Sequence, residues 1–250
     1  MSIAGSIEGW PHCRPVISVD GTALKSKYLG TLLIACCLDG NNQIFPLAFG
    51  ILDSENDSSW QWFLTELRRA IGHLDALIII SDRNNSIPKA VLKIFPDAEH
   101  GFCVQHLLGN LKTRFKDPAI SFLFNECSRA YTKASFAYYM NHLESISTDM
   151  CTYLHEIGYE KWARSYFSRR RNNIMTTNIS ESFNNVCEEA RDLPVASTLE
   201  NIRQILQRWF YERRMEAART TSILTKWADS LLQDHIDQSR TMNVSIFYAY

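Results

Sequence analysis

The chain has 250 residues, of which 46% are hydrophobic and 21% are charged, and its formal net charge is −1. This length and composition allow a full hydrophobic core and exclude a disordered or collagen-like chain. No run approaches the roughly 20 apolar residues of a membrane span, and residues 1–10 have neither a basic start nor an apolar signal segment. We therefore expect a soluble intracellular protein with no membrane partner.

The first part of the chain predicts three antiparallel strands followed by a helix. Residues 15–20 are short and β-branched, and the apolar residues 31–38 and 43–52 flank Asp-Gly-Asn-Asn at 39–42, a strong hairpin turn. Apolar positions then recur at helical spacing over residues 60–71, after a polar stretch at 57–59 that is a candidate N-cap. This helix is expected to lie across the hairpin.

Two more strands follow, and after them the pattern becomes helical. Residues 76–81 form the most continuous apolar run, typical of a strand buried on both faces. Residues 86–95 predict a helix with Pro88 in its first turn, and residues 99–104 predict a fifth strand. A strand, helix and strand in succession imply parallel pairing. The predicted fold class is therefore α/β (α+β), a sheet followed by a helical half.

Three acids occupy positions from which they could share a site. Asp20 and Asp82 each end an apolar run, and Glu181 lies on a late predicted helix. Mg²⁺ prefers oxygen ligands, and two such ions can activate water and stabilise the leaving oxygen of a phosphodiester. Taken alone, an aspartate after a strand is more often a turn former or a cap. The fold would have to bring these distant residues together.

A second pattern is Cys103-x-x-His106, where the fifth strand meets the first long helix. A structural zinc site needs four ligands, and although His100 is a candidate third, no second Cys or His pair follows. The alternative is a small buried thiol beside a histidine that caps a helix. Zinc is accordingly not expected. Seven cysteines, two of them adjacent at 36 and 37, also do not indicate a disulfide framework.

Three consecutive cations, Arg169, Arg170 and Arg171, stand in a polar loop before the helix of Glu181. Guanidinium groups beside a metal site could hold a phosphate backbone, so these residues are candidates for contact with DNA. A solvated loop explains the same pattern equally well.

In its ordered motifs the chain resembles the transposase domain of plant Mutator-like elements, the MULE family. The matching motifs fall within about residues 9 to 214, at residues 12–22, 25–30, 42–49, 59–64, 80–83, 95–100, 103–107 and 177–184. The resemblance implies a ribonuclease H-like mixed five-stranded sheet with flanking helices and an all-helical insertion before the last acidic helix. It also implies that Asp20, Asp82 and Glu181 are the DDE triad and that Cys103 and His106 are the family's Cys-x-x-His signature.

Several expectations follow from this resemblance. The sheet core would span residues 9–106, the helical insertion 107–172, the acidic and closing helices 173–219, and a tail 220–250. The activity would be hydrolysis and strand transfer on DNA, with Asp20, Asp82 and Glu181 binding two Mg²⁺ or Mn²⁺ ions. DNA would be the partner, a homo-oligomer is an open alternative, and the nucleus would be the location.

The chain also departs from the family pattern. The DNA-binding region that usually precedes this domain and the SWIM zinc finger that usually follows it have no counterpart in the sequence, which suggests a truncated transposase. The alternative is a non-catalytic, domesticated protein that associates with DNA or regulates transcription, and an inert relic is a third reading. Whether the chain is still an enzyme is left open by the sequence.

Overall fold

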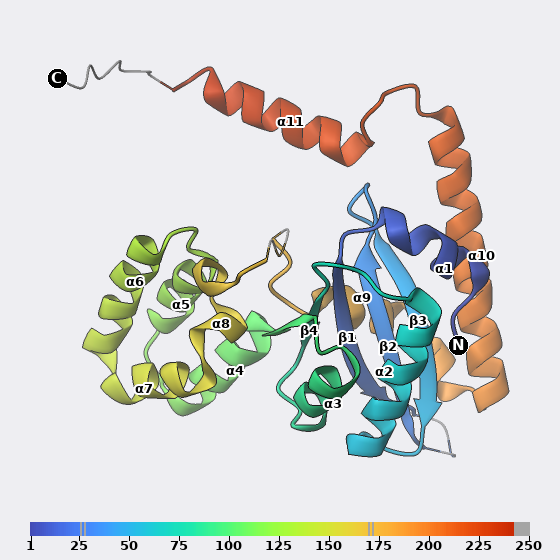
Figure 1. Cartoon of the computed structure of the whole chain (residues 1–250), viewed down its shortest axis with the longest axis horizontal. Helices are drawn as coiled ribbons and strands as arrows, with labels where there is room; N and C mark the ends of the chain where they lie inside the picture. The colour runs from blue at the N-terminus through green and yellow to red at the C-terminus, as the bar shows by residue number, and fades with distance from the viewer. Residues whose placement is uncertain (26, 28, 170, 172, 243–250) are drawn as a thin grey trace.

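The computed structural model describes residues 1–25, 27, 29–169, 171 and 173–242. It confirms the expected fold class, because a five-stranded mixed sheet is followed by a helical part (Figure 1). The strands are β1 (Val16–Ala23), β2 (Thr31–Leu38), β3 (Ile44–Leu52), β4 (Ile78–Ser81) and β5 (Glu99–Phe102). Their order is β3-β2-β1-β4-β5. As predicted, β1, β2 and β3 pair antiparallel, whereas β1, β4 and β5 pair parallel.

Helices cover both faces of this sheet. Ile17 and Val19 of β1 point into a core under α2 (Asp57–Ile71) and α3 (Ser86–Ile94), while Val16 points into a second core under α9 (Asn178–Val186) and α10 (Val195–Arg219). The alternation follows from the two-residue period of a strand. The N-cap of α2 is not within residues 57–59 as expected. It is Asn56, whose Oδ1 accepts a hydrogen bond from the Ser59 amide at 2.9 Å.

The helical part between β5 and α9 has a core of its own. Its helices are α4 (Val104–Arg114), α5 (Ile120–Arg129), α6 (Lys133–Ile146), α7 (Thr148–Ile157) and α8 (Tyr159–Trp162). The Trp162 ring packs on Phe124 and Phe136, with centroids 5.2 and 5.7 Å apart. Figure 1 shows this part to one side of the sheet, where β4 is labelled. Where one folding unit ends and the next begins stays a prediction.

The helical part is closed at its base. The chain enters it at Val104, whose amide donates to the carbonyl of Met175 at 2.9 Å. It leaves at Thr177, whose amide donates to the Cys103 sulfur at 3.3 Å. Four short helices lie between the longer elements or before the first strand: α1 (Ala4–Gly9), η1 (Trp10–His12), η2 (Arg164–Tyr166) and η3 (Glu189–Asp192). No helix in the described part of the chain is long and apolar enough to cross a membrane.

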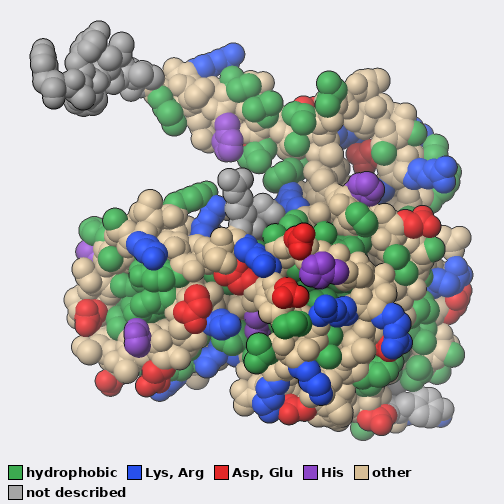
Figure 2. All heavy atoms as spheres, in the orientation of Figure 1, with side chains coloured by type: hydrophobic (Ala, Val, Ile, Leu, Met, Phe, Trp, Pro, Cys, Tyr) green, Lys and Arg blue, Asp and Glu red, His purple; other side chains and the backbone are tan. Residues whose placement is uncertain are grey.

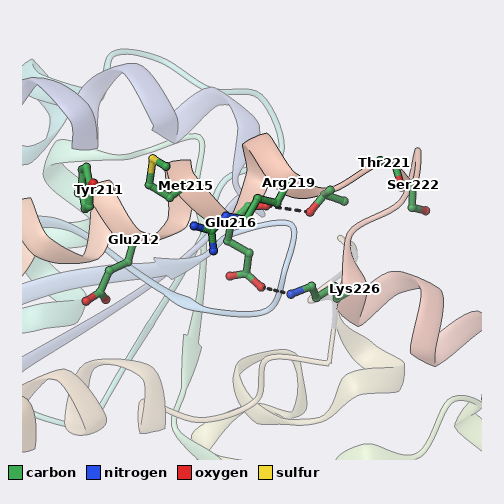
Figure 3. A pocket seen from close by; sticks show the side chains of 9 residues that line it. Tyr211, Glu212, Met215, Glu216, Arg219, Thr221, Ser222 and Lys226 are labelled. Carbon is green, nitrogen blue, oxygen red and sulfur yellow. Dashed lines mark hydrogen bonds and ion pairs between the residues drawn. The ribbon is translucent and has the colours of Figure 1, made fainter.

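The described chain ends in α11 (Lys226–Ser239), which projects from the body and exposes hydrophobic side chains (Figures 1 and 2). A groove of about 670 Å³ lies at the junction of α10 and α11, where Lys226 pairs with Glu216 at 2.7 Å (Figure 3). The start of α11 is tied to the β2–β3 turn, since Thr225 donates to the Gly40 carbonyl at 2.8 Å. That turn lies at the end of β1 opposite to Asp20.

Candidate active site

Helix α9 is docked on β1 by two pairs of polar side chains. The Ser180 hydroxyl donates to the carbonyl and hydroxyl of Ser18 at 2.8 and 2.7 Å, and Asn184 Nδ2 donates to Asp20 Oδ2 at 2.6 Å. The contacts match because residues four apart on a helix and two apart on a strand each share a face. Ser18 and Ser180 are fully buried, so this register is strongly specified. Glu181 is thereby brought to the edge of the sheet that carries Asp20.

The pKa of Asp20 indicates that the three predicted acids lie close together. Burial, together with the negative charges of Asp82 and Glu181, raises the pKa of Asp20 from 3.8 to about 7. Coulomb interaction weakens with distance, so acids that act on the pKa of Asp20 in this way lie near it. The structure therefore brings Asp20, Asp82 and Glu181 into one electrostatic cluster although they are far apart in the sequence.

Local hydrogen bonds hold the other two acids. Asp82 follows the last residue of β4, and its Oδ1 accepts from the Asn84 amide at 3.0 Å. Glu181 is in the first turn of α9, where its Oε1 accepts from the Thr177 hydroxyl one turn earlier. In both cases a carboxylate oxygen is fixed by the chain's own backbone or a neighbouring side chain.

Glu55 is a fourth acid at this edge that sequence reasoning missed. Its Oε1 accepts from the Trp60 indole at 3.0 Å, and a Cβ on Gly21 would lie 3.3 Å from its Oε2. Burial raises the pKa of Glu55, the Trp60 hydrogen bond opposes this, and the charge of Asp82 raises it further. The strand directions would have indicated Glu55. Strands β1, β3 and β4 run in the same direction, so the residues near their C-terminal ends meet at one edge of the sheet.

The Cys-x-x-His pair stands directly beside Glu181. Cys103 is the N-cap of α4 and His106 is one turn into that helix. The Nδ1 of His106 lies 3.4 Å from the Thr177 hydroxyl and 3.9 Å from Glu181 Oε1. The hydrogen bond with Cys103 raises the pKa of His106 to about 9. Burial by itself would raise the pKa of Cys103, but hydrogen bonds from His106 and Thr177 outweigh it and the pKa is lowered.

His100, the other histidine considered as a ligand, is engaged elsewhere. Its Nε2 lies 2.9 Å from the Ser81 hydroxyl, and burial lowers the pKa of the imidazole to about 3. Among the described residues, the cluster of metal-ligating side chains around Cys103 does not include it. His100 is therefore a neutral core histidine.

The structure engages two residues of the arginine run away from the acidic edge. Arg171 is 3% exposed and its guanidinium lies 3.7 Å from the centre of the Phe167 ring, where no phosphate can reach it. Arg169 donates to the carbonyls of Leu77 and Asp97, before β4 and β5, whereas Asp82 follows β4. It therefore lies at the opposite edge of the sheet from the acids. Arg170 lies outside the described residues.

Comparison with known proteins identifies the sheet part of the chain. Residues 16–110 match the model of the MULE transposase domain. The chain carries a MULE-type transposase domain. It is also 23% identical over 139 residues to the protein FAR1-RELATED SEQUENCE 4 of Arabidopsis thaliana, an alignment that covers 53% of this chain and 19% of that protein.

A second plant protein gives a similar result. FAR1-RELATED SEQUENCE 5 of Arabidopsis thaliana is 22% identical over 178 residues, which is 66% of this chain and 21% of that protein. The chain thus spans about a fifth of the length of these curated relatives. Among solved structures, a chain of a simian T-cell lymphotropic virus intasome bound to a PP2A subunit aligns over 64% of this chain and 60% of its own length. Its identity is 13% and its TM-score 0.29, too low to bear on the fold.

The matched segment contains most of the acidic edge. Asp20, Glu55, Asp82, Cys103 and His106 lie inside the MULE-type domain, whereas Glu181 lies 71 residues beyond its last matched position, 110. The contacts of α9 with β1 complete the cluster around the MULE-type domain. Glu181 therefore reaches this edge through the contacts of α9, outside the matched segment.

Proposed function

We propose that the MULE-type domain and α9 form a metal-dependent active site that hydrolyses phosphodiester bonds of DNA and transfers the resulting strand. The observation that carries this proposal is the packing of β1 against β4 and α9, which places Asp20, Asp82 and Glu181 at one edge of a transposase-derived sheet. The raised pKa of Asp20 agrees with this arrangement. Perturbed carboxylates of this kind are typical of catalytic and metal sites.

The donor set fits a hard divalent cation. Asp20, Asp82 and Glu181 supply carboxylate oxygens, the ligands that Mg²⁺ and Mn²⁺ prefer. Their mutual repulsion is the kind of imbalance that a cation relieves. Asn184 is buried beside Asp20, and its Oδ1 has no hydrogen-bond partner among the described residues, so one more oxygen is available. We propose that the three acids hold two Mg²⁺ or Mn²⁺ ions.

The side chains around the acids would orient them for this chemistry. When bound, the ions supply Lewis-acid polarisation of the phosphate and activation of the attacking oxygen. Asn184 fixes one oxygen of Asp20. Thr177 does the same for Glu181, and the Asn84 amide does so for Asp82. Fixed ligands lower the cost of reorganisation during the reaction.

Two cations at the junction of the sheet and the helical part support DNA as the partner. Arg83 follows Asp82 directly and donates to the hydroxyl of Tyr153, and Arg114 lies 4.5 Å from the centre of the same ring. Two guanidinium groups are thus held at the junction of the sheet and the helical part, beside the acidic edge. We propose that they contact the DNA backbone, as cations near a cleavage site commonly do. DNA as the substrate implies a nuclear location.

Nicking of a supercoiled plasmid by the full chain tests the catalytic proposal. We expect nicking with Mn²⁺ or Mg²⁺ that falls by about 100-fold or more in Asp20→Asn and in Glu181→Gln, because each loses a ligand worth several kcal/mol to the transition state. Glu156→Gln, an exposed position on α7, is the matched control.

Two results would oppose this function. Persistent nicking in both acid variants would remove the triad from the mechanism. No nicking by the folded wild-type chain with either metal would favour the alternative, a domesticated protein that associates with DNA without cutting it. In that case DNA association, measured by filter binding, should survive the loss of the acids.

A further inference from the structure

A second cluster of ligand atoms overlaps the acidic site at Glu181. Among the described residues, the Cys103 sulfur, a ring nitrogen of His106 and a carboxylate oxygen of Glu181 all lie within 4.8 Å of one another. In a tetrahedral zinc site the ligand atoms are about 3.3 to 3.8 Å apart, given metal–ligand distances of roughly 2.0 to 2.3 Å. Shifts of about 1 Å or less at each side chain would therefore close the cluster on an ion.

The chemistry of this cluster differs from that of the acids. A thiolate and an imidazole favour Zn²⁺, Co²⁺ or Cd²⁺, whereas Mg²⁺ takes oxygen ligands. The sequence shows only two of the three ligands, Cys103 and His106, because Glu181 arrives from α9, 75 residues after His106. A sequence search for a second Cys or His pair could not have found it.

The framework around these three residues is rigid. Cys103 caps α4 and its amide donates to the Ser81 carbonyl at 2.8 Å, while its sulfur accepts from the Thr177 amide. Thr177 in turn donates to Glu181. The side chains of His106 and Glu181 are 46% and 40% exposed, so solvent can fill a fourth position and an ion can enter. Three protein ligands with one open position are typical of accessible zinc sites.

We propose that Cys103, His106 and Glu181 bind a thiophilic divalent cation, Zn²⁺ in the first instance, at a site that shares Glu181 with the acidic cluster. Binding exchanges the S–H bond of Cys103 for a metal–sulfur bond, and the proton passes to solvent. If the proposed nuclease function holds, an ion bound here withdraws Glu181 from the Mg²⁺ or Mn²⁺ site. Zinc would then inhibit the reaction that magnesium supports.

Cobalt substitution tests the site without relying on activity. The full chain, stripped of metal with EDTA, is titrated with Co²⁺ while the thiolate-to-cobalt charge-transfer absorption is recorded. We expect one equivalent to bind with a charge-transfer band. That band should vanish in Cys103→Ser, and the affinity should fall at least about 10-fold in His106→Ala and Glu181→Gln. Cys151→Ser and His142→Ala, both in the helical part, are the matched controls.

The outcomes separate this proposal from the nuclease function. A band that persists in Cys103→Ser, or an unchanged affinity in His106→Ala and Glu181→Gln, would overturn the site. Since Cys103 is buried, its variant is first checked by circular dichroism, and if it does not fold the half-exposed His106 decides. Asp20→Asn should keep the cobalt band even though it strongly lowers nicking. A chain that never nicks DNA can still show the band.

Discussion

Replacing Asp20 with asparagine should remove a pH-dependent loss of stability from the metal-free protein. The pKa of Asp20 is about 7 in the folded chain against 3.8 for the unconstrained carboxyl. Between these values the unfolded chain has released the proton while the folded chain still holds it. Stability therefore falls as the pH rises from about 4 to about 7, and it stays lost above that range.

The size of the effect follows from the pKa difference. About 3 units at 1.36 kcal/mol per unit correspond to about 4 kcal/mol in the free energy of unfolding. Asparagine cannot ionise, and it can still accept the hydrogen bond from Asn184 through its own oxygen. The stability of Asp20→Asn relative to wild type should accordingly rise by about 4 kcal/mol between about pH 4 and pH 8.

Urea unfolding in EDTA, followed by circular dichroism at several pH values across this window, measures the difference. Asp234→Asn, at an exposed position on α11, is the matched control and should leave the pH profile of wild type unchanged. At about pH 8, Mn²⁺ at 100 times its Kd should raise the free energy of unfolding of wild type by about 2.7 kcal/mol. It should not raise that of Asp20→Asn. Parallel profiles for wild type and Asp20→Asn would refute the crowding of acids on which the active site rests.

Two further substitutions probe how the site is held. Ser180→Ala removes the hydroxyl that bonds the Ser18 carbonyl and hydroxyl, and it should lower the free energy of unfolding by about 1 to 3 kcal/mol in urea titrations; a loss below about 0.5 kcal/mol would mean that α9 is not anchored there. Glu55→Gln should weaken Mn²⁺ binding about 10-fold in thermal-shift titrations, because a negative charge facing Asp82 is lost; an unchanged Mn²⁺ midpoint would place Glu55 outside the site.

The sheet was predictable because its signals are local. The apolar runs that end at Asp20 and Asp82, and the hairpin turn at 39–42, give strand positions and directions that the structure confirms. Parallel pairing of β1 with β4 then places both aspartates at one edge. Glu181 depended on the family resemblance, because the two serine and asparagine contacts that dock α9 lie more than 160 residues apart in sequence.

The arginine run shows where local reasoning fails. Arg169 and Arg171 are indistinguishable from a solvated cationic loop in the sequence, yet Arg171 is buried against Phe167 and fills the space beside Gly101. A Cβ at Gly101 would lie 2.0 Å from the Arg171 guanidinium, so the glycine is what admits this side chain. Such a cavity is created by tertiary packing and leaves no periodic signal.

The closed base of the helical part has a consequence for how this fold can vary. With residues 103 and 177 hydrogen-bonded to each other, everything between them is, in topological terms, one long loop with joined ends. The entropy of closing such a loop grows by only about 0.6 kcal/mol per doubling of its length. The stability of the sheet therefore depends little on the length of the segment inserted between residues 103 and 177. Thr177, which closes this loop, also holds Glu181 through its hydroxyl. The inserted segment can therefore change in length without moving the third acid.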